Sequence, residues 1–310
     1  MGISLGTVHI PVLLKEVIDI LAPKSGERVL DCTFGGGGHT SAILNASDCY
    51  VCAIDRDPEA RDRALQLKNT YNERFDFVLA QFSEISVLFS DKQKFDAVLF
   101  DFGVSSFQLD KAERGFSFLN DAPLDMRMSK NGISAYDVVN TFSEEDLADI
   151  LWTYGDEILS RKIASAIVDA RKLHPIGTTL QLANIVRETA RFKHVTKKHS
   201  KIDIATKTFQ AIRIFVNDEL REISTALENL PEILNDGARM VLISFHALED
   251  RIVKNWAKSQ RNTLLPINDF VVRPTSKEIS ANPRSRSAIL RGFLYNTAGD
   301  RRKKSEDKGE

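Results

Sequence analysis

The sequence predicts an α/β protein built on a doubly wound, nucleotide-binding sheet. An apolar, β-prone segment at 28–34 runs into four consecutive glycines at 35–38, and a helix-like segment follows at 41–45. A strand, a glycine turn and a helix in this order form the first unit of such a sheet. Three more strand-like segments follow before residue 102, with helical segments between them, which is typical of α/β folds.

The four glycines suit a turn that bends with positive φ and brings bare backbone against a ligand. The N–H groups at the start of the next helix have no partner inside that helix, so they can bind the ligand. Because glycine turns are common, this motif indicates a binding site but does not identify what binds there.

The neighbouring elements follow from the spacing of apolar residues. An amphipathic helix is expected at 11–21, where a proline stands at the start and apolar residues recur at helical spacing. Further strands are expected at 50–55, 75–80 and 95–100, and further helices at 58–69 and 83–89.

The α/β pattern stops after residue 106. Residues 107–134 follow neither period, and we expect a long ordered loop of the kind that is usually functional in a compact domain. Residues 135–190 have helical periodicity. We therefore expect an all-α subdomain at 113–203, inserted into an α/β domain made of 1–112 and 204–310.

After the insertion, the sheet pattern resumes. We expect a long helix at 206–230, a fifth strand at 239–245 and a helix that ends at 258. Two β-like segments, 270–273 and 288–295, predict a closing hairpin. The charged segment 301–308 is typical of a disordered tail.

Composition excludes several classes of protein. Of the 310 residues, 43% are hydrophobic, and the formal net charge is −1, so the chain is not a globally basic nucleic-acid binder. Its three cysteines form no disulfide framework, and no signal peptide or membrane span is evident, which indicates a cytoplasmic protein without a membrane partner. Cys49 and Cys52 spell C-x-x-C without a second pair, and we expect burial. His246 has no second ligand at helical spacing, and no metal site is expected.

Two acids stand where ligands bind in such sheets. Asp55 ends the second strand, where a carboxylate commonly binds the ribose hydroxyls of a nucleoside. Asp57 directly precedes Pro58 and is the better cap for the next helix, which leaves Asp55 for the ligand. Asp101 ends the fourth strand and is expected to point into the crevice.

The choice of ligand lies between a dinucleotide and S-adenosylmethionine. Counted from Gly35, the third glycine of a dinucleotide turn would stand at position 40, where this chain has Thr40. Asp31, just before the glycines, would repel a pyrophosphate and attract a sulfonium or an amino group. The residues favour S-adenosylmethionine and leave a dinucleotide open.

Motifs between residue 9 and about residue 291 also carry a family resemblance. They include Asp31-Cys-Thr-Phe-Gly-Gly-Gly-Gly-His39, Leu99-Phe-Asp-Phe-Gly-Val-Ser-Ser106, Glu113-Arg-Gly-Phe-Ser-Phe118, Pro123-Leu-Asp-Met-Arg-Met128 and Asn282-Pro-Arg-Ser-Arg-Ser287. In these motifs the chain resembles the bacterial 16S rRNA cytosine-N4 methyltransferases of the MraW family. The chain departs from the family pattern at Phe107, at Ala247 and at Asp203-Ile204, where Pro, Ser and His-Pro are usual.

The resemblance implies a class I S-adenosylmethionine-dependent methyltransferase (Rossmann-like) sheet with a helical insertion. It implies methylation of the exocyclic N4 amine of a cytidine in 16S rRNA of the small ribosomal subunit. It also implies cofactor contacts at Gly37, Gly38, His39, Asp55, Phe82, Asp101 and Gln108.

This reaction needs an acceptor for the protons of a poorly nucleophilic amine, and Asp101 is our candidate. The alternative is that Asp101 only contacts the cofactor. Methylation at nitrogen requires no covalent cysteine, so Cys32 is expected to pack in the core.

Two regions are candidates for RNA contact. The loop at 107–128, with Phe116, Phe118, Met126 and Arg127, could wall the pocket of an unstacked base; alternatively its aromatic residues anchor the core of the insertion. Basic residues are densest at 191–201, and we expect Lys197 and Lys198 to contact phosphates. A second basic group contains Arg284, Arg286 and Arg291.

Two other classes of function remain open at this point. A nicotinamide-dependent oxidoreductase would use the same sheet, and a nucleotide-binding screen would separate it. A non-catalytic RNA-binding or assembly factor could keep the fold without turnover, but the intact glycines, Asp55 and Asp101 argue against it.

Overall fold

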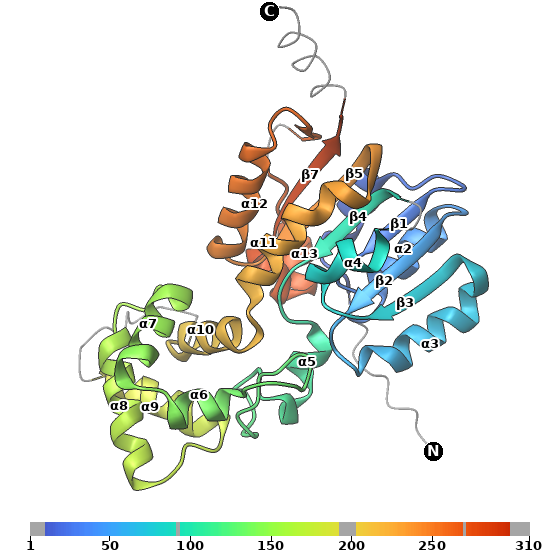
Figure 1. Cartoon of the computed structure of the whole chain (residues 1–310). Coiled ribbons are helices and arrows are strands. Elements are labelled where there is room, and N and C mark those ends of the chain that lie inside the picture. Colours follow the sequence, from blue (N-terminus) through green and yellow to red (C-terminus); the bar gives the residue numbers. More distant parts are fainter. Residues whose placement is uncertain (1–9, 91–93, 192–202, 269–270, 298–310) are drawn as a thin grey trace, which may run out of the picture. The chain divides into compact units, whose positions relative to one another are not determined.

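The computed structural model describes residues 10–90, 94–191, 203–268 and 271–297 (Figure 1). The chain divides into two compact units. Residues 1–103 and 220–310 form the first, which we call the α/β unit, and residues 104–219 form the second, which we call the helical unit.

The α/β unit contains one seven-stranded sheet in the order β3-β2-β1-β4-β5-β7-β6. Its strands are β1 (Arg28–Asp31), β2 (Tyr50–Asp55), β3 (Phe75–Leu79), β4 (Phe95–Asp101), β5 (Leu234–Ser244), β6 (Leu264–Pro266) and β7 (Ile289–Tyr295). β1 to β5 are parallel, and β7 runs antiparallel to both β5 and β6. The doubly wound sheet is confirmed. Its order reverses between β1 and β4, where sheets of this class bind ligands beyond the carboxyl ends of the strands.

Helices cover both faces of this sheet (Figure 1). They are α1 (Leu14–Leu21), α2 (Gly38–Ala46), α3 (Ala60–Tyr71), α4 (Ile85–Phe89), α11 (Glu219–Asn229), α12 (Ala247–Ser259) and the short α13 (Ser276–Ala281). Strand residues alternate between two apolar cores: Val29 faces the core shared with α1, α2 and α3, and Leu30 faces the one shared with α4, α11 and α12. All three cysteines are buried and free, as predicted.

The helical unit has an apolar core of its own. Its helices are α5 (Ser106–Asp110), α6 (Ala135–Thr141), α7 (Glu144–Gly155), α8 (Ser160–Leu173), α9 (Thr179–Arg191) and α10 (Ala205–Asn217). The core includes Leu151 of α7, Ile163 of α8, Val186 of α9 and Ile212 of α10. The helices expected within 135–190 are therefore confirmed.

The helical unit is wider than the predicted insertion at 113–203. α10 belongs to it because Phe209 and Ile212 lie in the same core as α7 and α8. α10 ends where Asp218 adopts φ 50°, so the single long helix expected at 206–230 is wrong: the segment forms α10 and α11. α5 was also missed inside the expected loop.

The closing hairpin differs from the prediction. β7 pairs with β6, which is only three residues long and contains Pro266, while Val272 forms an isolated bridge with Leu290. A strand this short has no readable alternation, which is why the sequence pattern missed it. The charged segment 301–308 lies outside the described residues. No helix in the described part of the chain is long and apolar enough to cross a membrane.

Two glycines of the helical unit provide a stability test. Both have positive φ, but a Cβ on Gly115 would meet the carbonyl oxygen of Pro123 and lie 2.6 Å from the nitrogen of Asp125, whereas one on Gly132 would meet no atom within 4 Å. We expect Gly132→Ala to lower the free energy of unfolding by about 1 kcal/mol, from backbone strain alone. Gly115→Ala adds overlap with backbone and should cost about 3–4 kcal/mol.

Denaturant unfolding, followed by helix content, measures the two glycine variants. Equal destabilisation would contradict the described path of the chain around Gly115.

Candidate functional site

The glycine turn lies between β1 and α2. Gly35 and Gly37 have φ of 52° and 75°, so the predicted need for positive φ is confirmed at these positions. α2 begins at Gly38 rather than at residue 41. A Cβ on Gly37 would lie 2.9 Å from the ring of Phe34, and one on Gly38 would overlap Pro11. Packing thus requires glycine at both positions.

Asp31 holds this turn against the sheet. The side chain has no exposed surface; one oxygen accepts a 2.6 Å hydrogen bond from the Thr40 hydroxyl and the other a 3.0 Å bond from the Thr33 N–H. Thr40 stands where a dinucleotide-binding turn has its third glycine. Through this hydrogen bond, its hydroxyl links α2 to the end of β1. Burial raises the pKa of Asp31. Because Asp31 is enclosed, its charge can act on a ligand only at a distance.

Asp55 connects the end of β2 to the same turn. Its Oδ2 accepts a 2.8 Å bond from the Gly35 N–H, and its Oδ1 accepts a 2.8 Å bond from the Asp57 N–H. The carboxylate of Asp57 accepts from the Glu59 N–H at 3.0 Å and so stabilises the turn before α3. The prediction that Asp57 caps the helix is wrong, because the N-cap residue of α3 is Glu59 and no side chain caps it. Asp55 stays partly exposed, and burial raises its pKa to about 6.

Asp101 ends β4 with an incompletely partnered carboxyl group. Its backbone N–H donates to the Thr33 hydroxyl at 2.7 Å, and its Oδ1 is buried without a hydrogen-bond partner among the described residues. About a fifth of the side chain is exposed (21%). Burial, followed by the negative charges of Asp31 and Glu249, raises the pKa of Asp101 well above its usual range.

His39 lies beside Asp101 and is almost enclosed. Its Nε2 is 3.0 Å from the carbonyl oxygen of Val12, and its Nδ1 is 3.7 Å from Oδ2 of Asp101. A carbonyl can only accept a hydrogen bond, so Nε2 carries the proton and Nδ1 presents a lone pair to Asp101. Burial lowers the pKa of His39 to about 4, so the imidazole is neutral at physiological pH.

Phe82 follows β3 at the same edge of the sheet. Its ring packs edge-on against Phe100, with centroids 5.7 Å apart, and is partly exposed. The carboxyl ends of parallel strands meet at one edge. The α/β unit therefore brings the glycine turn, Asp55, Phe82 and Asp101 together at the switch point, while their contacts with a ligand stay predictions.

Gln108 belongs to the helical unit. It lies in α5, where it is buried and its side-chain oxygen accepts a 3.0 Å bond from the Ser105 N–H. This bond is half of a capping box that starts the helix. The predicted cofactor contact of Gln108 stays a prediction.

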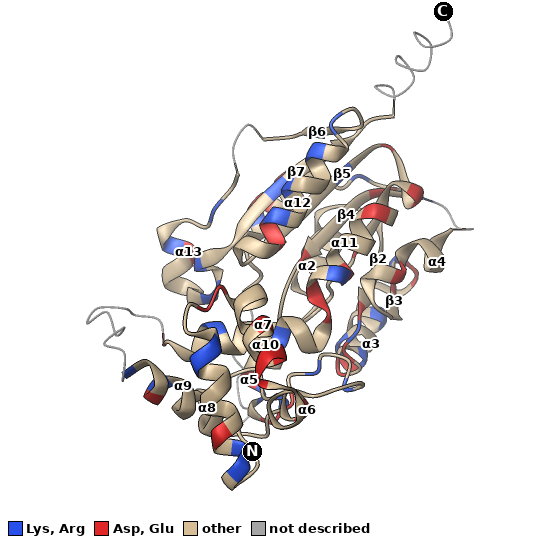
Figure 2. Cartoon of the chain, turned by 60° about the vertical axis from the view of Figure 1, so that its left-hand side comes forward, with Lys and Arg blue, Asp and Glu red and all other residues tan. Residues whose placement is uncertain are grey.

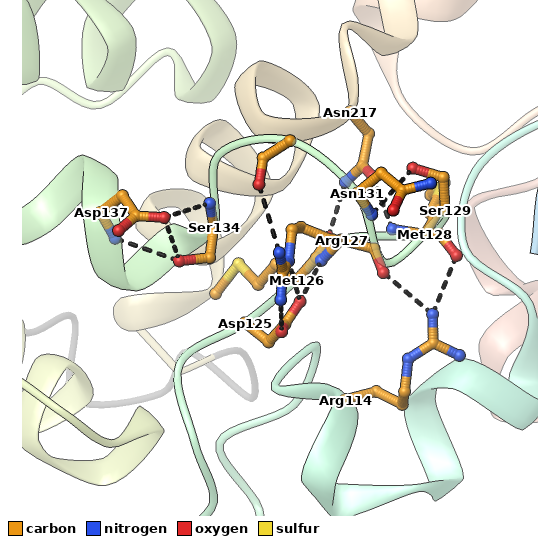
Figure 3. A network of polar contacts seen from close by, with 11 residues as sticks. Arg114, Asp125, Met126, Arg127, Met128, Ser129, Asn131, Ser134, Asp137 and Asn217 are labelled. Atoms are coloured by element: carbon orange, nitrogen blue, oxygen red, sulfur yellow. Dashed lines mark hydrogen bonds and ion pairs between the residues drawn. The ribbon is translucent and has the colours of Figure 1, made fainter.

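Arg127 has a structural role that the sequence did not reveal. Its guanidinium donates to both carboxylate oxygens of Asp125, at 3.0 and 2.7 Å, and to the carbonyl of Gly132 at 3.2 Å (Figure 3). Substrate contact by Arg127 stays a prediction. The guanidinium that would make this contact is already paired with Asp125 of the same loop.

The rest of that loop is held from both sides (Figure 3). Arg114 donates to the carbonyls of Arg127 and Met128 at 2.9 and 3.0 Å. The buried Asn217 amide accepts from the Met128 N–H at 2.8 Å and donates to the Met126 carbonyl at 2.7 Å. These bonds hold Met126 at φ 63°, a conformation that a side chain disfavours.

The aromatic residues of the loop pack in the core of the helical unit. Phe116 is buried there, and the ring of Phe118 meets that of Phe209 at 4.7 Å between centroids. The core-anchoring alternative is therefore confirmed for both. Lys197 and Lys198 lie outside the described residues.

The second basic group divides into two kinds of residue. Arg291 on β7 is paired with Asp250, through nitrogen–oxygen distances of 2.8 and 3.3 Å. Arg284 and Arg286 are exposed in the 3₁₀ turn after α13. In Figure 2, the ribbon is blue, marking Lys and Arg, at positions around α13 and along α12.

The expectation that His246 has no second potential metal ligand at helical spacing is wrong. Its Nε2 lies 3.2 Å from Oε1 of the buried Glu249, three residues further on. The other side-chain oxygen of Glu249 accepts from the N–H groups of Phe245 and His246, which caps α12.

Sequence reasoning missed four residues of the site: Pro11, Val12, Thr33 and Thr40. Pro11 and Val12 lie in His9-Ile-Pro-Val-Leu-Leu14, a further motif in which the chain resembles the MraW family, and this was the available signal. Their contacts join segments far apart in the sequence, and no local pattern predicts such contacts.

Comparisons with known proteins show which family the chain belongs to. The sequence model of the MraW methylase family matches residues 6–294. "Ribosomal RNA small subunit methyltransferase H" of Rickettsia canadensis is 48% identical over 302 residues, which cover 91% of this chain and 96% of that protein. The protein of the same name from Rickettsia bellii is 48% identical over 304 residues, covering 91% and 97%. An rRNA methylase structure from Streptococcus thermophilus aligns with a TM-score of 0.42 at 10% identity, over 94% of this chain and 99% of that one. The chain belongs to the MraW methylase family.

Proposed function

We propose that this protein transfers a methyl group from S-adenosylmethionine to the N4 amine of a cytidine in 16S rRNA of the small ribosomal subunit. Membership in a methylase family and relatives named as small-subunit rRNA methyltransferases support the reaction and the substrate. The observation that carries the proposal is the buried, unpartnered Oδ1 of Asp101 at the switch point of the sheet. A cytoplasmic location is part of this proposal, because the proposed substrate is ribosomal RNA.

The residues at this edge fit S-adenosylmethionine. The partly exposed carboxylate of Asp55 can accept hydrogen bonds from ribose hydroxyls. Asp31 and Glu249 form a negative environment around Asp101, because their charges raise the pKa of its carboxyl group. Such an environment attracts a sulfonium or ammonium group and repels a pyrophosphate. It therefore favours S-adenosylmethionine over a dinucleotide.

When bound, S-adenosylmethionine supplies an electrophilic methyl group on a positively charged sulfur. The N4 lone pair of cytosine is delocalised into the ring, so the amine attacks only as it loses that conjugation. The Asp101 carboxylate accepts a proton from the amine as its nitrogen forms the new bond. Asp55 and the glycine turn contribute by holding one reactant in a fixed position.

The ribose assignment is tested at Asp55. We expect Asp55→Asn to weaken binding of S-adenosylmethionine and S-adenosylhomocysteine equally, about 10- to 100-fold, because both share the ribose and lose charged hydrogen bonds. Isothermal titration calorimetry measures both dissociation constants.

Asp57→Asn is the matched control for Asp55→Asn. It changes an acid on the same loop that caps a turn, and asparagine caps equally well, so affinity should stay within about twofold of wild type. Unchanged affinity in Asp55→Asn would refute the ribose assignment.

The reaction is tested with labelled S-adenosylmethionine and either naked 16S rRNA or 30S subunits. Nucleoside mass spectrometry should find the label on cytosine N4, and Asp101→Asn should lower kcat about 10²- to 10⁴-fold because the proton acceptor is lost. Label at another atom, or none from either substrate, would contradict the proposed function.

RNA contact is tested by reversing charge at Arg284 and Arg286. Both are exposed, and the double change to Glu should raise KM for RNA several-fold and reduce its salt dependence, with unchanged cofactor affinity. Lys258→Glu, at the far end of α12, is the control and should leave KM unchanged. The same reversal at Lys197 and Lys198 tests the predicted cluster at 191–201, and an unaltered KM would remove either group from the RNA site.

A further inference from the structure

The pair formed by His39 and Asp101 contains two hydrogen-bond acceptors that face each other without a donor. In the neutral ring of His39, the single N–H proton is on Nε2, which donates to the Val12 carbonyl, so Nδ1 presents a lone pair. Oδ2 of Asp101 lies 3.7 Å from that lone pair. Two lone pairs at this distance repel each other unless a proton or a cation lies between them.

The tautomer of His39 is fixed by a segment that is itself held in place. Leu13 donates its backbone N–H to the Glu278 carboxylate at 2.7 Å, and the carbonyl of Ile10 accepts from the Asn282 side chain at 3.1 Å. Both anchors belong to α13 and the residue after it. The Val12 carbonyl between them therefore keeps its orientation toward Nε2.

The charged groups around Asp101 add to the demand for a positive partner. Asp31 at the end of β1 and Glu249 of α12 are both negative, and His39 of α2 is neutral. Among the described residues, Asp101 forms no ion pair with a lysine or an arginine, and its Oδ1 has no donor. In the part of the chain that the structure describes, no positively charged side chain compensates an ionised Asp101 carboxylate.

We propose that His39 is a positioning residue that keeps one proton on the Asp101 carboxyl in the ligand-free protein, and that binding of S-adenosylmethionine displaces this proton. The proton on Oδ2 points at the Nδ1 lone pair and removes the repulsion. The positive sulfonium of the ligand replaces it, and the proton passes to the solvent.

The proton balance closes over one turnover. Asp101 loses a proton when the cation binds and is then able to accept one. As the N4–carbon bond forms and the carbon–sulfur bond breaks, the sulfur keeps the electron pair and becomes neutral. The amine proton then passes to Asp101, which restores the starting state. This second half rests on the proposed function, whereas the release of a proton on binding does not.

The inference is tested by counting protons released on binding. Calorimetry at pH 7.5 in phosphate and in Tris, which differ in ionisation enthalpy, gives this number for S-adenosylmethionine and for S-adenosylhomocysteine, whose sulfur is neutral. We expect the wild-type protein to release between about half a proton and one proton more with the former. Equal release with the two compounds would overturn the inference.

Three variants assign the proton. Asp101→Asn should abolish the difference between the compounds, because the amide does not titrate. His39→Gln keeps an N–H for the Val12 carbonyl and removes the Nδ1 lone pair, so the difference should shrink at pH 7.5. Asp55→Asn is the control. It weakens binding of both compounds but should leave the difference between them in the number of protons released unchanged.

The variants also separate this inference from the proposed function. Wild-type proton release by His39→Gln would overturn the role of His39. Failure to bind either compound would overturn the inference together with the cofactor assignment. Normal proton release in a protein that methylates no RNA would contradict only the proposed function.

Discussion

The hydrogen bond between the Asp31 carboxylate and the Thr40 hydroxyl is the contact on which the site depends. It is 2.6 Å long and has no access to water, and it ties the first turn of α2 to the end of β1. This bond restrains both ends of the glycine turn, in which the Gly35 N–H donates a hydrogen bond to Asp55. The neighbouring Thr33 fixes the backbone of Asp101. Asp31 thus connects α2, through Thr40, with the Thr33 segment that bonds to Asp101.

Burial disfavours the charged form of the three acids Asp31, Asp55 and Asp101. Their ionisation therefore reduces the free energy of unfolding of the protein. The pKa of Asp55 is about 6 in the folded protein and near 3.8 when exposed. Between these values the folded state binds a proton that the unfolded state has lost, so stability from this group falls as pH rises through that window. Asp31 and Asp101 shift in the same direction. These three acids therefore lower the stability of the folded protein at neutral pH.

Much of the fold could be predicted because its signals are local. β1, β2 and β4 lie where their apolar runs indicated, and Asp55 and Asp101 stand at strand ends as expected. The break at Asp218 was missed because the apolar stripe continues through it, and only the φ of 50° divides the helix. A strand of three residues such as β6 has too few side chains for a readable pattern.

The candidate site was less predictable because its partners come from distant segments. The sequence indicated His39, but not that the Val12 carbonyl occupies Nε2 and leaves only Nδ1 for Asp101. Likewise, Arg127 is paired with Asp125, and Arg291 with Asp250. A basic residue in a sequence does not show whether an acid already neutralises it.

The family resemblance and the geometry of the site give different kinds of information about the same residues. The resemblance implies which positions contact the cofactor, and the seven-stranded sheet brings most of them to one edge. The geometry adds why some residue types stand there: the glycines allow close packing and positive φ, and the Thr40 hydroxyl links α2 to Asp31. A crystal structure of the complex with S-adenosylhomocysteine tests this account most directly. The account predicts both ribose hydroxyls within hydrogen-bond distance of Asp55 and the sulfur on the Asp101 side of the turn. An adenosyl group bound away from the carboxyl ends of β1, β2 and β4 would contradict it.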